Sequence, residues 1–235
     1  MTTALEMEAA ARLTKAVRDE LGDPSTWVYV RIYPKSLALG TIDAIWSVRV
    51  RSAQVVQVVA RYAAYRRAQG ANPEIDTPSD LLGTFEKLGV DGWISQIGNR
   101  QRTYASPQAP EKADAVRRAA QILADAGLAT PTDLGEMAAH SPDRLSQVEA
   151  AWKSIPGETT GLTWHRLALV TGAYDLAPSP WLLQFIGSAV GDVTDLAAER
   201  LLDAAASRLG VSPMAVRQAV WNRQVASNPT SGLNQ

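Results

Sequence analysis

Apolar residues recur at helical spacing along most of the chain, and short segments rich in glycine and proline interrupt them. The first amphipathic segment, Ala4 to Leu21, stops at Gly22-Asp23-Pro24. The longest apolar stretch runs from Ser36 to about Arg67 and predicts two helices that break near residues 47–52. Alanine, leucine and arginine dominate these segments, and all three favour helices. The pattern predicts an all-α fold.

Proline and capping residues mark further helix starts, since proline is tolerated in the first helical turn. We expect helices that open at Thr77-Pro78-Ser79, cover Glu111 to Ala126, open at Ser141-Pro142-Asp143, begin near Thr163, open at Pro178-Ser179-Pro180, cover Thr194 to Leu209, and run from Pro213 to about Arg223. The one candidate strand, Trp27 to Tyr33, is short and would be isolated, so we expect no sheet.

These elements predict a single two-lobed helical domain over residues 1–226, with a cleft between the lobes. Lobe A covers about 36–172, and lobe B combines 1–35 with 173–226. The end of the chain, Ser227 to Gln235, is rich in serine, asparagine, glycine and proline, which predicts a disordered tail.

The composition limits which metals, cofactors and partners the protein can use. The 235 residues are 46% hydrophobic and include no cysteine and two histidines, so disulfides, cysteine-ligated metals and iron–sulfur clusters are excluded and we expect no metal or cofactor. The formal net charge of −1 is unlike that of a general nucleic-acid coat. No secretion signal or membrane-spanning run is visible, so we expect a cytoplasmic monomer without a membrane partner.

The segment from Trp152 to Arg166 joins two predicted helices through Pro156-Gly157 and a second glycine, Gly161. Glycines let a backbone pass close to a ligand with its amides exposed. The amides of Gly157, Thr159 and Gly161, with the next helix N-terminus, would form a phosphate cradle. An ordinary turn between helices is the alternative.

Other segments follow in a recognisable order. Leu37 to Ser47 leads into Val48-Arg49-Val50-Arg51, the segment Leu81 to Gly98 follows, and a helix begins at Glu111 before the hairpin. From about Leu37 to Gly191 this order resembles the helix-hairpin-helix DNA glycosylases of the endonuclease III superfamily. The resemblance implies double-stranded DNA as the partner.

The resemblance also implies roles for particular residues. Arg49 falls where the family places a polar side chain that enters the base stack, and the polar loop after Gln96 suits phosphate or groove contact, with a solvated loop as the alternative. The expected DNA-facing residues are Arg49, Arg51, Asn99, Arg100, Arg102, Gly157, Thr159, Gly161, Thr163 and Ser179.

Two departures from the family pattern bear on chemistry. The family's catalytic aspartate is best matched by Ser179, which can cap a helix but carries no charge. Thr163 stands where bifunctional members carry a Schiff-base lysine, so strand cleavage by an amine is not expected.

Asp43 is the leading substitute for the missing carboxylate, because it lies in the apolar run Ile42-Asp43-Ala44-Ile45-Trp46. Burial of an unpaired carboxylate raises its pKa, which suits acid catalysis on a departing base. Alternatively, Asp43 caps a helix or pairs with an arginine such as Arg49 or Arg31. Asp175 is a second catalytic candidate or a turn residue.

Aromatic residues supply the stacking wall that a flipped base needs, and Tyr33 and Trp46 are the expected pocket residues. Together these features predict a monofunctional DNA glycosylase that excises a modified base, in base-excision repair or in defence against phage DNA. A non-catalytic helix-hairpin-helix DNA-binding protein is one alternative. A helical protein-interaction domain is another, and an apolar exposed groove without a basic rim would favour it.

Overall fold

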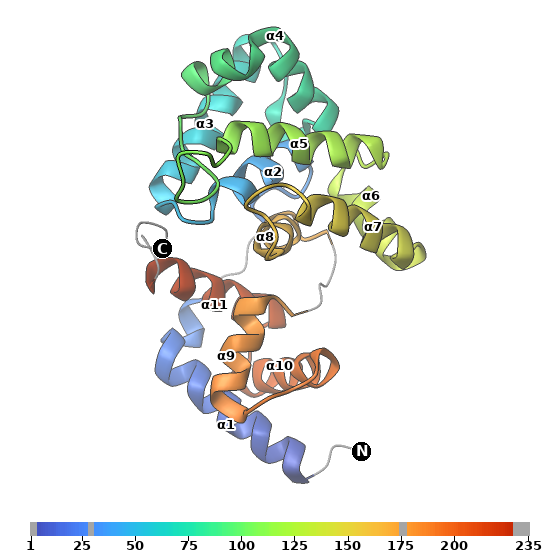
Figure 1. Cartoon of the computed structure of the whole chain (residues 1–235). Helices are drawn as coiled ribbons and strands as arrows, with labels where there is room; N and C mark the ends of the chain where they lie inside the picture. Colours follow the sequence, from blue (N-terminus) through green and yellow to red (C-terminus); the bar gives the residue numbers. More distant parts are fainter. Residues whose placement is uncertain (1–3, 28–30, 174–177, 228–235) are drawn as a thin grey trace. The chain divides into compact units, whose positions relative to one another are not determined.

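The computed structural model describes residues 4–27, 31–173 and 178–227. Within these ranges the secondary structure consists of eleven α-helices and two short 3₁₀ turns, with one isolated β-bridge between Arg102 and Glu111 (Figure 1). The predicted all-α class is confirmed. The candidate strand falls partly on residues 28–30 and the tail on 228–235, and both stretches lie outside the described residues. No helix in the described ranges is long and apolar enough to cross a membrane.

The chain divides into two compact units, one formed by residues up to 30 with 176–227 and the other by residues 31–175. The smaller unit contains α1 (Ala4–Leu21), α9 (Pro180–Val190), α10 (Asp195–Leu209) and α11 (Pro213–Ser227). Its core gathers apolar side chains from all four helices, including Leu13, Val17, Phe185, Ile186, Leu202 and Val220. The expected cleft between lobes stays a prediction.

The larger unit is built around α2 (Leu37–Trp46), whose ten residues are all buried. Four helices pack on it: α3 (Ser52–Ala68), α4 (Pro78–Gln96), α5 (Lys112–Asp125) and α8 (Leu162–Thr171) (Figure 1). Gly40 brings α2 and α8 close together, since a β-carbon there would lie 2.7 Å from Thr171 Cγ2. A helix enclosed on every side is apolar all round, which explains its continuous hydrophobic sequence.

Capping boxes set two helix starts in the larger unit. Thr77 and Asp80 exchange side-chain and backbone hydrogen bonds at the start of α4, and Thr130 and Asp133 do the same at α6 (Pro131–His140). Helix α6 is absent from the sequence prediction, although its Thr-Pro start matches that of α4. It is followed by α7 (Pro142–Lys153).

Helix α4 is broken at Gly89, whose φ of 66° and ψ of 171° are not helical. The break makes two shorter helical segments out of one continuous run. Glycine adopts this left-handed region without a steric cost.

Candidate functional site

Asp43 lies on the enclosed helix α2 and is only 5% exposed. Its Oδ1 accepts hydrogen bonds from Arg166 Nε at 2.7 Å and from Ser47 Oγ at 3.0 Å. Its Oδ2 accepts a longer one, 3.2 Å, from the Tyr33 hydroxyl. The carboxylate is therefore paired, and its partner is Arg166 on α8 rather than Arg49 or Arg31.

Tyr33 is half-buried and is fixed at its backbone as well, where its amide donates to Val170 O at 2.9 Å. Burial, together with the neighbouring Asp43 carboxylate, raises the pKa of Tyr33 well above its usual value of 10. The phenol therefore keeps its proton at neutral pH and remains a donor to Asp43. Tyr33, expected in the base pocket, and Asp43, the catalytic candidate, therefore lie in contact.

Trp46 does not line a pocket. It is fully buried and packs against Trp93, with ring centroids 5.8 Å apart. Its indole ring therefore belongs to the core of the larger unit and offers no face to a base, which corrects the sequence prediction.

The loop after α2 places Arg49 in the left-handed region, with a φ of 61°. This conformation is uncommon for a residue with a side chain and costs about 1 kcal/mol or more. The Arg49 side chain is exposed and donates to Thr103 O at 3.3 Å. Arg51 is exposed and is the N-cap residue of α3. Two cations therefore stand close together on a short, strained loop.

The loop after α4 is held mainly by contacts within itself. Asn99 Oδ1 accepts from the Gln101 amide, and Arg102 donates to Ala109 O. Arg100 is exposed and pairs with Asp91 and with Glu111, each at 2.9 Å. Surface pairs of this kind contribute little to stability and can be exchanged for a ligand. Arg100 and Arg102, both expected to meet DNA, lie at the surface but already have partners.

The hairpin between α7 and α8 has left-handed glycines at both ends, with φ values of 96° at Gly157 and 71° at Gly161. Gly157 lies against Thr103, and Gly161 lies under the side chain of Lys153. The Gly161 amide already donates to Glu158 O at 3.1 Å, which removes it from the expected phosphate cradle. Thr159 is exposed at the tip.

The interior of the hairpin is a polar chain. Trp152 Nε1 donates to Thr163 Oγ1 at 2.9 Å, and Thr163 donates to Glu158 Oε2 at 2.5 Å. Glu158 is only 4% exposed, and burial raises its pKa despite the Thr163 bond and nearby Lys112 and Arg49. Thr163 therefore braces the hairpin from inside and is too deeply buried to meet a phosphate directly.

Lys112, at the start of α5, is 1% exposed and supports the C-terminal end of α2. Its Nζ donates to Ile45 O at 2.5 Å and to Val48 O at 2.9 Å. A cation there satisfies carbonyls that lack helical partners. Burial lowers the pKa of Lys112 from 10.5 to about 8. The sequence analysis missed this residue because a lysine at a helix start reads as a surface residue.

Ser179 and Asp175 are the remaining expected residues. Ser179 belongs to the smaller unit, where its Oγ accepts from the Leu182 amide at 3.1 Å and caps α9. This capping role is the one the sequence allowed for a serine. Asp175 lies outside the described residues, so its catalytic role stays a prediction.

The larger unit thus joins Asp43, Tyr33 and Arg166 in one buried cluster, and Arg49, Thr103 and the hairpin in a second. Together they define an all-helical protein with a glycine-bounded hairpin next to buried charged groups. The chain belongs to the family described as "Domain of unknown function (DUF8548)", whose model matches residues 11–225. No curated protein and no solved structure matches the chain significantly.

Proposed function

We propose that this protein is a monofunctional DNA glycosylase that removes a modified base from double-stranded DNA, with Asp43 as its catalytic carboxylate. One observation carries the proposal. Asp43 is held by Arg166, which lies on the helix that directly follows the hairpin. The carboxylate and the proposed phosphate-binding hairpin are therefore fixed within one rigid set of packed helices, α2 and α8.

The hydrogen bonds around Asp43 suit a particular role. A carboxylate that accepts from Arg166, Ser47 and Tyr33 is satisfied as an anion. Oδ1 has two donors and Oδ2 has one long contact, so Oδ2 retains capacity to accept a proton. In N-glycosidic hydrolysis it would stabilise positive charge on the sugar and take a proton from the attacking water, while the base leaves. This assigns Asp43 the role of base and electrostatic stabiliser instead of the acid that an unpaired carboxylate would have been.

The DNA-facing surface would combine three segments that touch one another. Thr103 contacts both Gly157 of the hairpin and the Arg49 guanidinium. Exposed Arg49 would fill the gap left by a flipped nucleotide, and the amides of Gly157 and Thr159 would meet a phosphate. Lys153, over Gly161, places an ammonium beside the same turn, where it is paired with Glu149.

The product should be an intact abasic site. Thr163 has no amine, and the Lys112 amine is enclosed and donates to two carbonyls. The Lys153 amine beside the hairpin is paired with Glu149 at 2.5 Å, which holds it as an ammonium. Borohydride should therefore trap no covalent protein–DNA adduct in good yield.

A non-catalytic DNA-binding protein is the second candidate, and the Asp43–Arg166 pair is what favours it. Buried ion pairs often serve packing alone, and Ser179 supplies no replacement charge. In this case the hairpin and Arg49 would bind duplex DNA without releasing a base.

Mass spectrometry of bases released from normal, damaged and phage-modified duplexes separates these candidates. Release of one base class by the intact protein, with an alkali-labile abasic site left behind, supports the glycosylase. Duplex binding that weakens with salt, without release from any duplex, supports the binding protein. If the protein neither binds duplex DNA nor releases a base, both candidates are overturned.

A further inference from the structure

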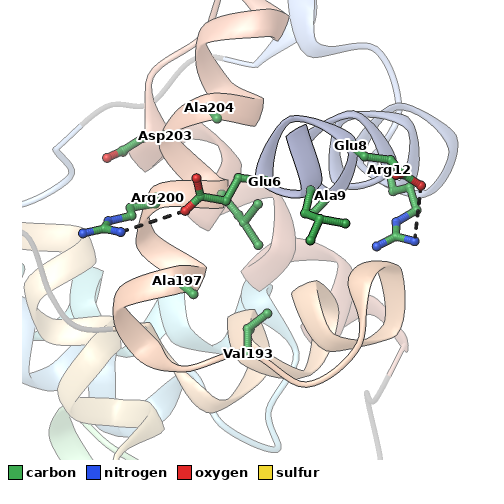
Figure 2. Close-up of a pocket in the computed structure, with 11 residues that line it drawn as sticks. Glu6, Glu8, Ala9, Arg12, Val193, Ala197, Arg200, Asp203 and Ala204 are labelled. Atoms are coloured by element: carbon green, nitrogen blue, oxygen red, sulfur yellow. Dashed lines mark ion pairs between the residues drawn. The ribbon is translucent and has the colours of Figure 1, made fainter. Parts of the chain in front are cut away.

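The smaller unit has a groove between α1 and α10 with a volume of about 770 Å³ (Figure 2). Small side chains, Ala9, Ala197 and Ala204, form part of its wall and leave the space open. None of the residues proposed to contact DNA lines it. Its lining is mixed, with six apolar and five charged residues. Hollows of this volume are typical of binding sites.

Large apolar side chains remain exposed beside this hollow. Leu5, which lines the groove from α1, is 78% exposed, and Leu196, next to Ala197 in the first turn of α10, is 64% exposed. Exposed leucines next to an open groove mark an interaction surface better than scattered ones do. The same face therefore carries exposed leucine side chains and a groove that could receive such side chains from another molecule.

Charges of both signs are arranged along the groove. Arg200 pairs with Glu6 at 4.0 Å, and Arg12 pairs with Glu8 at 3.9 Å, at opposite ends (Figure 2). These are long, exposed pairs, so exchange of partners costs little. Three acidic residues, Glu6, Glu8 and Asp203, line the same groove and oppose a phosphate backbone.

From these features we infer that the groove is the interface of a two-fold homodimer, in which the same face of a second copy occupies it. A two-fold axis exchanges the two ends of the groove. Arginine at one end of each copy then meets the acidic residue at the other end of its partner. Leu5 and Leu196 of each copy enter the hollow of the other. A partner with charges of only one sign would leave either the arginines or the acidic residues of the groove without an opposite charge.

The test is the molar mass of the full chain in solution, measured by light scattering and by sedimentation over a range of concentrations. The wild-type chain should reach twice its 25.2 kDa. The double variant Leu5→Glu/Leu196→Glu should raise the dimer dissociation constant by about a hundredfold or more, because each substitution counts twice in a two-fold interface. Both positions lie in a first helical turn, where an acidic residue favours the helix, so the variant should stay folded.

Val56→Glu is the matched control, since Val56 is 65% exposed but lies on α3 of the larger unit. It should leave the dimer intact. A monomeric wild-type chain at every concentration overturns the inference, and so does a dimer that the double variant leaves unchanged. Base release plays no part in this readout, so the inference stands or falls independently of the proposed activity.

Discussion

An aspartate, an arginine and a tyrosine meet at each end of α2, but their hydrogen bonds differ between the two ends. At the N-terminal end, Asp76 accepts from Tyr62 at 2.8 Å and from Arg66 at 2.6 and 2.9 Å. Its backbone carbonyl also accepts from Ser36 Oγ and from the Ala38 amide. At the C-terminal end, Asp43 accepts from Arg166 through one guanidinium nitrogen only and from Tyr33 at a longer distance.

This difference separates a structural cluster from one that could take part in chemistry. The Asp76 cluster is a bidentate pair between neighbouring segments, and its tyrosine, Tyr62, is fully buried. The Asp43 cluster joins residues 123 positions apart, and its tyrosine is only half-buried. Both carboxylates are buried, so burial alone does not identify a catalytic group. Each carboxylate has one oxygen with a single donor, but that contact is longer at Asp43, 3.2 Å from Tyr33 against 2.9 Å from Arg66 at Asp76. The longer contact and the half-buried tyrosine distinguish the Asp43 cluster.

The largest expected effect is that of Asp43→Asn on base release. The amide keeps the shape but loses the charge and the ability to take a proton, so the single-turnover rate should fall by about a hundredfold to ten-thousandfold. Duplex binding should be kept, because phosphate contacts lie elsewhere. Full activity in a variant with a lowered melting temperature would place Asp43 in the structural class with Asp76.

Asp76→Asn should show the opposite pattern. Loss of one charge from a buried bidentate pair should lower the free energy of unfolding by about 3 kcal/mol, because Arg66 is left without its main counter-charge. Chemical denaturation measures this loss. The rate of base release per folded molecule should stay within about twofold of wild type. A large drop in that rate would contradict a purely structural role for Asp76.

Lys112 makes the C-terminal end of α2 sensitive to pH. The unfolded chain keeps the proton on Lys112 up to about pH 10.5, whereas the folded protein loses it near pH 8. Between these values the unfolded state binds more protons, so this residue makes the free energy of unfolding rise with pH, by about 1 to 3 kcal/mol.

Lys112→Met should remove that rise from a series of urea denaturation curves. Lys87→Met, at an exposed position on α4, serves as its control and should keep the wild-type slope. Identical slopes in Lys112→Met and wild type would mean that Lys112 titrates normally in the folded protein.

The smallest effects compare the two tyrosines. Tyr62→Phe leaves a buried carboxylate with one donor fewer and should cost about 1 kcal/mol of stability. Tyr33→Phe removes a longer bond at a half-buried site, so it should cost less stability but change the rate of base release several-fold. Thermal melts and single-turnover rates of both variants measure this, and a larger stability loss at Tyr33 would contradict the assignment.

Helix positions could be predicted from the sequence because their signals are local. The Pro-Gly and capping patterns locate most helix starts, and the Thr130-Pro131 start of α6 carried the same signal as Thr77-Pro78. The apolar run around Asp43 correctly indicated a buried helix.

The partners of the site residues could not be predicted in this way. Arg166 meets Asp43 only because α8 packs on α2, which depends on the close approach at Gly40. The burial of Lys112 depends on where the end of α2 falls. Trp46 reads equally well as a pocket wall or a core residue until the position of Trp93 is known. These contacts follow from tertiary packing, which no local pattern records.

The enclosure of α2 has a consequence for how the larger unit moves. A helix that packs against α3, α4, α5 and α8 with no exposed residue cannot fray by itself. Its backbone amides should exchange with deuterium only when the whole unit opens, and should be the slowest of the larger unit to exchange. Sequence changes along α2 would therefore alter the lifetime of the entire unit, whereas changes in α6 would be felt locally.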